Sequence, residues 1–160
     1  MKDIINTYLS TGARRVELLR PKFTWNNIDF KNHRIQFDGK GDKSRYVPMT
    51  PAIAELLLKR LTDGLEYPFK YGPDHVSHKL RDYYRIAKIE KANLHTLRKT
   101  YGSILIQEKY ADIYRVSKYL GHSSVKVTEK HYIHLLEDDH ESMSNNLDKY
   151  YGSLSGETSS

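Results

Sequence analysis

Short patterns of basic and imidazole side chains in this chain indicate a site for a phosphate-like anion. His95 and Arg98 lie three residues apart in LHTLRKT, so a helix would place the imidazole and the guanidinium on one face. Arg14 stands three residues before Glu17, a spacing that would equally suit an ordinary helical ion pair. Because a guanidinium fork binds oxyanions bidentately, His95 and Arg98 could converge on one anion.

Further candidates lie at a predicted turn, after a glycine, and near the end of the last helical stretch. The turn sequence GKGDKSR would present Lys40, Lys43 and Arg45 to a phosphate backbone, although basic turns also serve solubility. His122 follows a glycine that ends a helical stretch, where an imidazole can simply favour the helix dipole. Tyr132 is one of 13 tyrosines, so only its context can make its hydroxyl a nucleophile.

The elements that must position these groups are mostly helical. Alternation of polar and apolar residues over 25–49 predicts two or three antiparallel strands around the turn at 39–42. Thr50 and Pro51 are typical of a helix start, and the apolar stripe that follows predicts a helix. The predicted fold is mostly α with one small antiparallel sheet, an α+β class. Its other helical stretches are 3–10, 13–19, and regions near 75–88, 95–108, 112–120 and 124–136.

Length and composition exclude several classes of protein. A chain of 160 residues forms one compact unit, and it contains no apolar run of the ~18 residues that a membrane span needs. Without cysteine there is no disulfide framework, thiol nucleophile or cysteine-ligated zinc. We therefore expect a cytoplasmic protein. The apolar helix at the very start lacks its earlier turns, which suggests a fragment of a longer protein.

The distribution of charge is more informative than the net charge of +6. Residues 135–160 carry six acids and one base, whereas residues 1–134 carry 25 Lys and Arg against 14 Asp and Glu, a balance of +11. A body this basic attracts polyanions, nucleic acid first, although a charged, solvated surface is the simpler explanation.

The acidic end of the chain divides into two segments. Residues 137–151 would form a short helix whose apolar positions need a partner surface, namely Met143, Leu147, Tyr150 and Tyr151. We expect this segment either to dock on its own domain or to be disordered. The Ser- and Gly-rich residues 152–160 should be mobile.

Taken in order, these patterns resemble the catalytic domain of the phage integrases, or tyrosine recombinases. The similarity extends from about residue 4 to 136, and its motifs are Thr11-Gly12-Ala13-Arg14, Gly39-Lys40-Gly41-Asp42-Lys43-Ser44-Arg45, His95-Thr96-Leu97-Arg98, Leu120-Gly121-His122-Ser123 and Thr128-Glu129-Lys130-His131-Tyr132. The resemblance implies a DNA breaking-rejoining fold, with a catalytic domain over 1–136 and a possible exchange helix over 137–151. It also implies a bacterial, archaeal or phage-encoded enzyme associated with the nucleoid.

The resemblance also implies a role for each candidate. Tyr132 would attack the scissile phosphate and form a 3′-phosphotyrosyl link, while Arg14 and Arg98 would hold the non-bridging oxygens. Lys40 would protonate the departing 5′-oxygen. His95 would accept the tyrosine proton or orient the phosphate, and His122 would donate to a phosphoryl oxygen. No metal, ATP or other cofactor is implied; the partners would be a double-stranded recombination site and further protomers.

Three features depart from the family pattern. Lys99 stands where histidine commonly follows the second arginine, and we expect it to contact DNA together with Lys43 and Arg45. Ten residues separate His122 from Tyr132, one more than the commonest spacing. We also expect this chain to lack the family's N-terminal core-binding domain and therefore to bind DNA weakly.

Three alternative functions remain open from the sequence. The chain could be a DNA-binding or regulatory module without productive catalysis, or a type IB topoisomerase-like enzyme that relaxes DNA. It could also be a metal protein, since several histidines are paired at helical spacing, namely His75 with His78 and His131 with His134, with His140 nearby.

Overall fold

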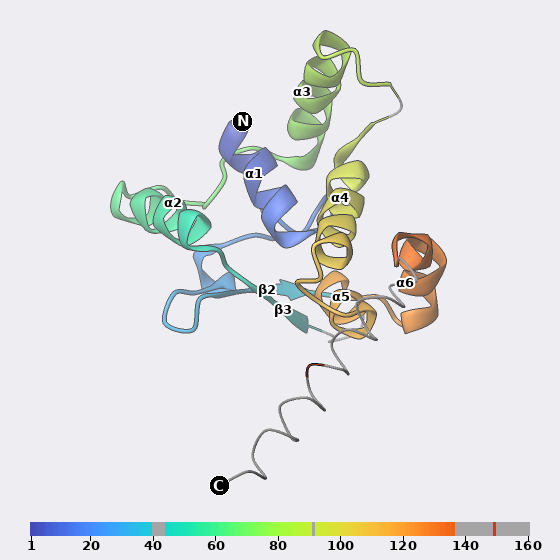
Figure 1. The fold of residues 1–160 in the computed structure, drawn as a ribbon. Helices are drawn as coiled ribbons and strands as arrows, with labels where there is room; N and C mark the ends of the chain where they lie inside the picture. The colour runs from blue at the N-terminus through green and yellow to red at the C-terminus, as the bar shows by residue number, and fades with distance from the viewer. Residues whose placement is uncertain (40–43, 91, 137–148, 150–160) are drawn as a thin grey trace, which may run out of the picture.

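A computed structural model describes residues 1–39, 44–90, 92–136 and 149 of the chain (Figure 1). Within these residues the α-helices are α1 (Lys2–Thr11), α2 (Pro51–Thr62), α3 (Pro73–Ile86), α4 (Leu94–Gln107), α5 (Ile113–Leu120) and α6 (Val125–Tyr132). The strands are β1 (Ile28–Asp29), β2 (Arg34–Asp38) and β3 (Ser44–Pro48), and short 3-10 helices lie at η1 (Trp25–Asn27) and η2 (Ile133–Leu135). The predicted class, mostly α with one small antiparallel sheet, is confirmed.

The helices that carry candidate residues begin at side-chain caps. The Asn93 side chain accepts from the backbone N–H groups of His95 and Thr96, which starts α4 immediately before the His-x-x-Arg pattern. Asp112 and Ser124 cap α5 and α6 in the same way. Gly121 ends α5 with a φ of 64°, a left-handed conformation that favours glycine, so the chain turns sharply just before His122.

The sheet has the order β1-β2-β3 with both neighbouring pairs antiparallel. Ile35 of β2 pairs with Val47 of β3, and Phe37 pairs with Arg45, so these residues share the face that packs inward. Residues 40–43, between β2 and β3, lie outside the described residues.

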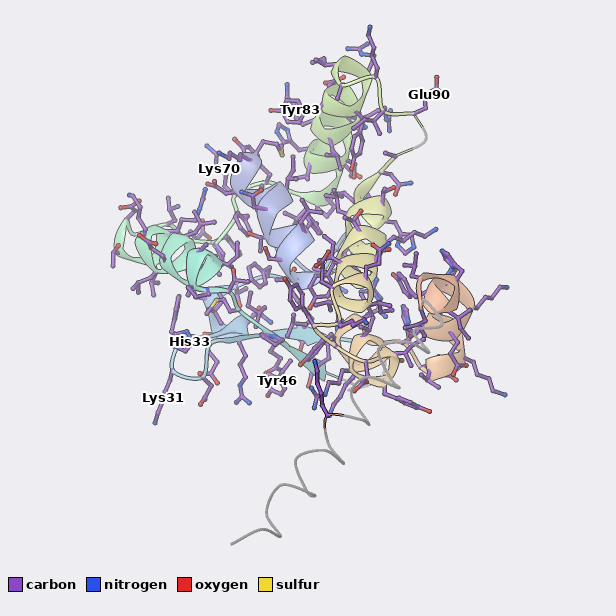
Figure 2. All side chains as sticks on the ribbon, viewed as in Figure 1. Lys31, His33, Tyr46, Lys70, Tyr83 and Glu90 are labelled. Carbon is purple, nitrogen blue, oxygen red and sulfur yellow. The ribbon has the colours of Figure 1, made fainter. Side chains whose placement is uncertain are left out.

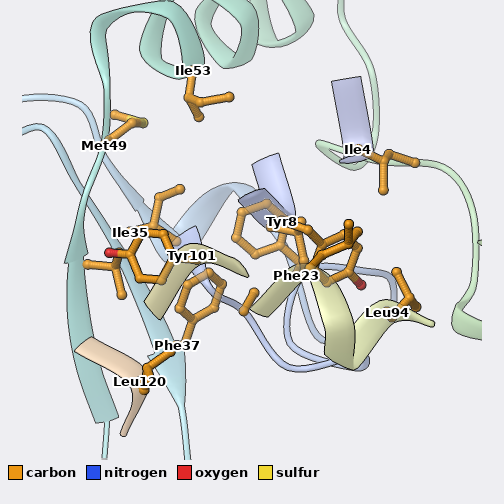
Figure 3. Packing of buried hydrophobic residues seen from close by; sticks show 14 of the residues in the cluster. Ile4, Tyr8, Phe23, Ile35, Phe37, Met49, Ile53, Leu94, Tyr101 and Leu120 are labelled. Atoms are coloured by element: carbon orange, nitrogen blue, oxygen red, sulfur yellow. The ribbon is translucent and has the colours of Figure 1, made fainter. Parts of the chain in front are cut away.

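The core lies between this sheet face and the helices. α1 packs along α4, while α5 contacts both β3 and α6 (Figure 1). In the close view, Ile35 and Phe37 of the sheet face Tyr101 and Leu120 (Figure 3). Charged side chains such as Lys31, Lys70 and Glu90 project from the rim of the molecule, and all three are exposed (Figure 2).

In the described part of the chain, no helix is long and apolar enough to cross a membrane.

One predicted element is wrong. Residues 13–19 were expected to form a helix, but the chain after Gly12 runs through turns until residue 22. Leu18 and Leu19 are both fully buried, and Glu17 reaches back to the Arg14 backbone N–H over 2.6 Å. Core packing and this side-chain bond therefore override the local helical preference. The remaining expected helices differ from α1 to α6 by a few residues at most, except that the last helix ends at Tyr132 and continues as η2.

Candidate active site

Arg14 and Arg98 converge on the backbone at the end of α5. Arg98 is 3% exposed, and its Nη1 donates to the carbonyl of Gly12 over 2.7 Å while its Nη2 donates to the carbonyl of Leu120. Nη2 of Arg14 donates to the next carbonyl, that of Gly121, over 2.6 Å. The turn after α1 and the middle of α4 thus bring two guanidinium groups to one point.

The two arginines line a cavity of about 420 Å³ together with most of the other candidates. α4 supplies His95 on its first turn, and the turn after α5 supplies His122. α6 contributes Val127 and its last two residues, His131 and Tyr132. The lining residues are Ala13, Arg14, Arg15, His95, Arg98, Lys99, His122, Val127, His131 and Tyr132.

The electrostatics of this cavity favour an anion. Burial, and then the positive charges of Arg14 and Arg45, lower the pKa of Arg98 to about 10. Arg98 therefore stays protonated near neutral pH but lies in an environment that destabilises its charge. An oxyanion placed between Arg14 and Arg98 would relieve this repulsion and accept hydrogen bonds from both side chains.

His95 and His122, two of the three histidines that line the cavity, each have a pKa below the ordinary value for histidine. Burial, and then the charges of Arg98 and Arg14, lower the pKa of His122 to about 4. Its Nδ1 lies 2.8 Å from Oγ1 of Thr128 on α6. Burial also lowers the pKa of His95, and Arg98 and Lys99 contribute to the shift. A neutral imidazole can accept a proton, and it can also donate a hydrogen bond through its other nitrogen.

Tyr132 lies at the end of α6 and is only 4% exposed. Burial raises the pKa of its hydroxyl, while the charge of Arg98 acts in the opposite direction. The ring rests on the backbone of Gly102 in α4, since a Cβ there would be 2.6 Å from Tyr132 Oη. His131 meets the same ring edge-on, with 6.3 Å between ring centroids. The phenol is therefore beside the arginine cluster but packed away from solvent.

Comparison with known proteins identifies this arrangement. The model of the phage integrase family matches residues 1–139. The chain belongs to the phage integrase family.

Individual relatives agree with this assignment. The tyrosine recombinase XerC of Anoxybacillus flavithermus is 29% identical over 153 residues, which cover 84% of this chain and 50% of that protein. A probable integrase/recombinase of Acholeplasma phage L2 is 31% identical over 143 residues, which cover 83% of this chain and 48% of the relative. The chain thus spans about half the length of the curated relatives it matches.

The fold agrees with a solved integrase structure. The catalytic domain of bacteriophage HP1 integrase superposes with a TM-score of 0.69 and 25% sequence identity, covering 89% of this chain and 79% of that one. The expected tyrosine recombinase catalytic-domain fold is therefore confirmed.

The residues expected to contact DNA have different surroundings in this integrase fold. Lys40 and Lys43 lie outside the described residues. Lys99 is exposed and lines the cavity, as a phosphate contact would. Arg45 is not a surface residue: it is 8% exposed and its guanidinium is bound to Glu17. In the structure the donors of Arg45 bind protein groups, and its expected contact with DNA stays a prediction.

Glu17 is the residue of the site that sequence reasoning undervalued. The Arg14-x-x-Glu17 spacing pointed to a solvent-exposed helical ion pair, whereas Glu17 is 7% exposed and binds two arginines. Burial alone would raise the pKa of this carboxyl, but hydrogen bonds and charge from Arg45, then hydrogen bonds from Arg14, lower it to about 2. The signal that could have found it is an acid on a segment that also contributes Leu18 and Leu19 to the core.

The histidines proposed as metal ligands do not gather into a site within the part of the chain that the structure describes. Among the described residues, no group of three His, Asp or Glu side chains could hold a metal ion. His75 instead stacks on Tyr71, with 4.5 Å between ring centroids. His140 lies outside the described residues.

Proposed function

We propose that this chain is the catalytic domain of a site-specific DNA recombinase, which cleaves and rejoins strands through a phosphotyrosyl intermediate. The observation that supports this most strongly is the cavity that unites Arg14, Arg98, His95 and His122 with Tyr132. Two fixed cations, two neutral imidazoles and one phenol are the groups that phosphoryl transfer to a tyrosine requires.

The chemistry follows from these groups. Oη of Tyr132 attacks the scissile phosphorus, a new O–P bond forms, and the bond from phosphorus to the 5′-oxygen breaks. The phenolic proton passes to a neutral imidazole, for which His95 is the candidate, and Lys40 supplies a proton to the departing 5′-oxygen. Arg14 and Arg98 neutralise the charge that develops on the non-bridging oxygens. Since the phosphotyrosyl link conserves the energy of the phosphodiester, the reverse reaction rejoins strands without ATP.

The packing of Tyr132 adds a condition to this mechanism. A phenol that is 4% exposed and seated on Gly102 cannot reach a phosphate in a DNA duplex. α6 would therefore shift or turn when DNA binds, so that Oη leaves the backbone of Gly102 and meets a phosphate held by Arg98.

The partners follow from the same assignment. Double-stranded DNA with a recombination site is the substrate, and further protomers assemble on that DNA; the proposed location is the cytoplasm, in contact with the nucleoid. The basic balance of +11 in residues 1–134 supports binding to DNA. A binding module without catalysis would need neither the buried tyrosine nor the neutral imidazoles, so this alternative is not favoured.

A nicked suicide substrate tests the proposal directly. The nick lets the short fragment that ends in the 5′-hydroxyl diffuse away, so the covalent protein–DNA adduct accumulates and is visible on a denaturing gel. We expect an adduct with the native chain and none with Tyr132→Phe, which keeps the ring and removes only the hydroxyl. Tyr114→Phe is the matched control, because Tyr114 is 69% exposed on α5. An adduct formed by a folded Tyr132→Phe chain would refute the assignment of the nucleophile.

A further inference from the structure

Arg45 occupies a buried position where β3 meets the end of α5. Its Nε donates to the backbone carbonyl of Tyr119 over 2.7 Å, and its guanidinium carbon lies 4.9 Å from the centre of the Phe37 ring. The backbone of Gly121 approaches so closely that a Cβ there would be 2.8 Å from Arg45 Cδ. Arg45 therefore packs against the segment whose carbonyl binds Arg14.

The other two nitrogens of Arg45 bind the carboxylate that holds Arg14. Nη1 and Nη2 of Arg45 donate to the two oxygens of Glu17 over 2.8 and 2.7 Å. The same carboxylate accepts from Nη1 of Arg14 over 2.8 Å and from the Arg14 backbone N–H over 2.6 Å. Glu17 thus fixes the main chain and the guanidinium of Arg14, and Arg45 fixes Glu17.

Arg14 and Arg45 differ in whether their positive charge can reach a bound anion. The side chain of Arg14 is 42% exposed and faces the cavity, whereas that of Arg45 is 8% exposed and its donors are bound to Glu17 and to the carbonyl of Tyr119. Arg45 pairs with both oxygens of Glu17. The negative charge of this buried carboxylate is therefore balanced by a buried guanidinium, and Arg14 is not needed to neutralise it. Without Arg45, Glu17 would keep Arg14 as its only cation, and Arg14 would turn its donors and its charge toward the carboxylate.

We infer that Arg45 is a positioning residue for phosphate binding: it satisfies Glu17 so that the guanidinium of Arg14 stays directed at the scissile phosphate. This inference rests on the proposed function, and it gives Arg45 a role without any contact to DNA. It predicts a defect that depends on the charge of the phosphate, which a purely structural role would not produce.

The chain contains a closely matched control for Arg45. Arg60 in α2 also combines an acidic partner, a backbone carbonyl and an aromatic ring, namely Asp3 at 2.7 Å, the carbonyl of Pro68 at 3.3 Å and the Phe69 ring at 5.2 Å. None of these groups lines the cavity. Arg60→Gln therefore removes a similar set of interactions away from Arg14.

The test compares two nicked substrates that differ at the scissile phosphate. One has the natural phosphodiester, and the other has a methylphosphonate, in which a methyl group replaces one non-bridging oxygen and removes the negative charge. Arg45→Gln should slow adduct formation about 10- to 100-fold on the phosphodiester, because Arg14 no longer meets the developing charge. On the methylphosphonate the same variant should stay within about fivefold of the native chain, since less charge needs to be neutralised. Arg60→Gln should match the native chain on both.

Each other result has a defined meaning. A defect of Arg45→Gln that is equal on both substrates, or no defect, would overturn the inference. If Arg45→Gln does not fold, Arg45→Lys keeps a buried cation beside Glu17 but cannot bind both of its oxygens, and it should show the same dependence on phosphate charge.

A second measurement is independent of catalysis. Inorganic phosphate is titrated into the full chain without DNA, and the side-chain resonances of Arg14 and Arg98 are followed by NMR. Arg45→Gln should weaken phosphate binding about 5- to 10-fold relative to Arg60→Gln, as the loss of one well-placed charge-assisted contact would. If the native chain binds phosphate at Arg14 but forms no adduct with DNA, the proposed function fails while the role of Arg45 stands. Equal phosphate affinity in the two variants would disprove that role.

Discussion

The ring of Tyr132 lies directly on the backbone of Gly102, so closely that a methyl group on Gly102 would be 2.6 Å from Oη and 2.7 Å from Cζ of the tyrosine. Gly102 stands in α4, one helical turn after Arg98. The helix that supplies an arginine to the cavity therefore also provides the flat surface on which the candidate nucleophile is held.

Gly102→Ala should displace Tyr132 from this surface. Overpacking costs about 1 to 3 kcal/mol, which exceeds the gain of about 1 kcal/mol from alanine in a helix, so the free energy of unfolding should fall. The raised pKa of the Tyr132 hydroxyl should also return toward its ordinary value of 10.0 as the ring becomes more exposed. Denaturant unfolding and NMR of 13C-labelled tyrosine measure the two effects. At Gly72, where an added Cβ meets nothing within 4 Å, alanine should leave Tyr132 unchanged.

Removing Glu17 alone should destabilise the fold more than removing Glu17 and Arg45 together. Glu17→Gln leaves the buried Arg45 guanidinium without its anionic partner. Breaking a buried ion pair in this way lowers the free energy of unfolding by about 3 to 5 kcal/mol. Glu17→Gln/Arg45→Met removes both charges and should recover part of that loss. A double-mutant cycle in urea measures the coupling. Additive losses in the cycle would show that the two side chains do not stabilise one another.

His122 should make the stability of the protein depend on pH between about 4 and 6.5. Because the pKa of His122 is lowered to about 4 from 6.5, the unfolded chain binds the proton more readily than the folded chain in this range. The contribution of neutral His122 to the free energy of unfolding is complete above about pH 6.5, and it is lost as the pH falls toward about 4. Unfolding measured across this range should therefore show a shallower pH dependence for His122→Gln than for the native chain. Parallel pH profiles of the two proteins would contradict the lowered pKa.

Lysine should not replace Arg98. The guanidinium donates to the carbonyls of Gly12 and Leu120, which lie on separate segments, and an ammonium on a flexible stem cannot reproduce that fork. Arg98→Lys should lower the rate of adduct formation by about 100-fold or more, while the salt dependence of DNA binding stays the same because the charge is kept. Kinetics on the suicide substrate measure the first effect, and binding at several salt concentrations measures the second. Arg81→Lys on the exposed part of α3 should alter neither.

The helices and the sheet were predictable because their signals are local. Thr50 with Pro51, Asn93, Asp112 and Gly121 all mark helix ends by side-chain or backbone preferences that act within a few residues. The convergence of Arg14 with Arg98 could be expected only from the resemblance to integrases, since no local signal joins the turn after α1 to the middle of α4.

The segment from Ala13 to Leu19 failed as a helix prediction for a tertiary reason. Its local pattern allows a helix, but Leu18 and Leu19 both enter the core while Glu17 is drawn to Arg45 from β3. The partner of Glu17 is 28 residues away in sequence, so no inspection of neighbouring residues could identify it. The same long-range pairing buries Arg45, whose place in the basic sequence GKGDKSR had suggested a surface residue.

The acidic end of the chain should weaken nonspecific DNA binding through its charge. Residues 137–160 carry six acids and one base, and the segment 137–151 that was expected to dock or be disordered lies outside the described residues, apart from Lys149. A chain that ends at Leu136 loses a net charge of −5 and keeps +11, so its affinity for random duplex DNA should rise, most strongly at low salt where these charges are least screened. A chain of all 160 residues with the six acids changed to their amides separates charge from length, and it should bind DNA as the truncated chain does.

Sedimentation of the native and truncated chains without DNA tests the role of the segment 137–151 in assembly. Both chains should be mostly monomeric, and a dimer that survives the truncation would show that the segment does not hold protomers together.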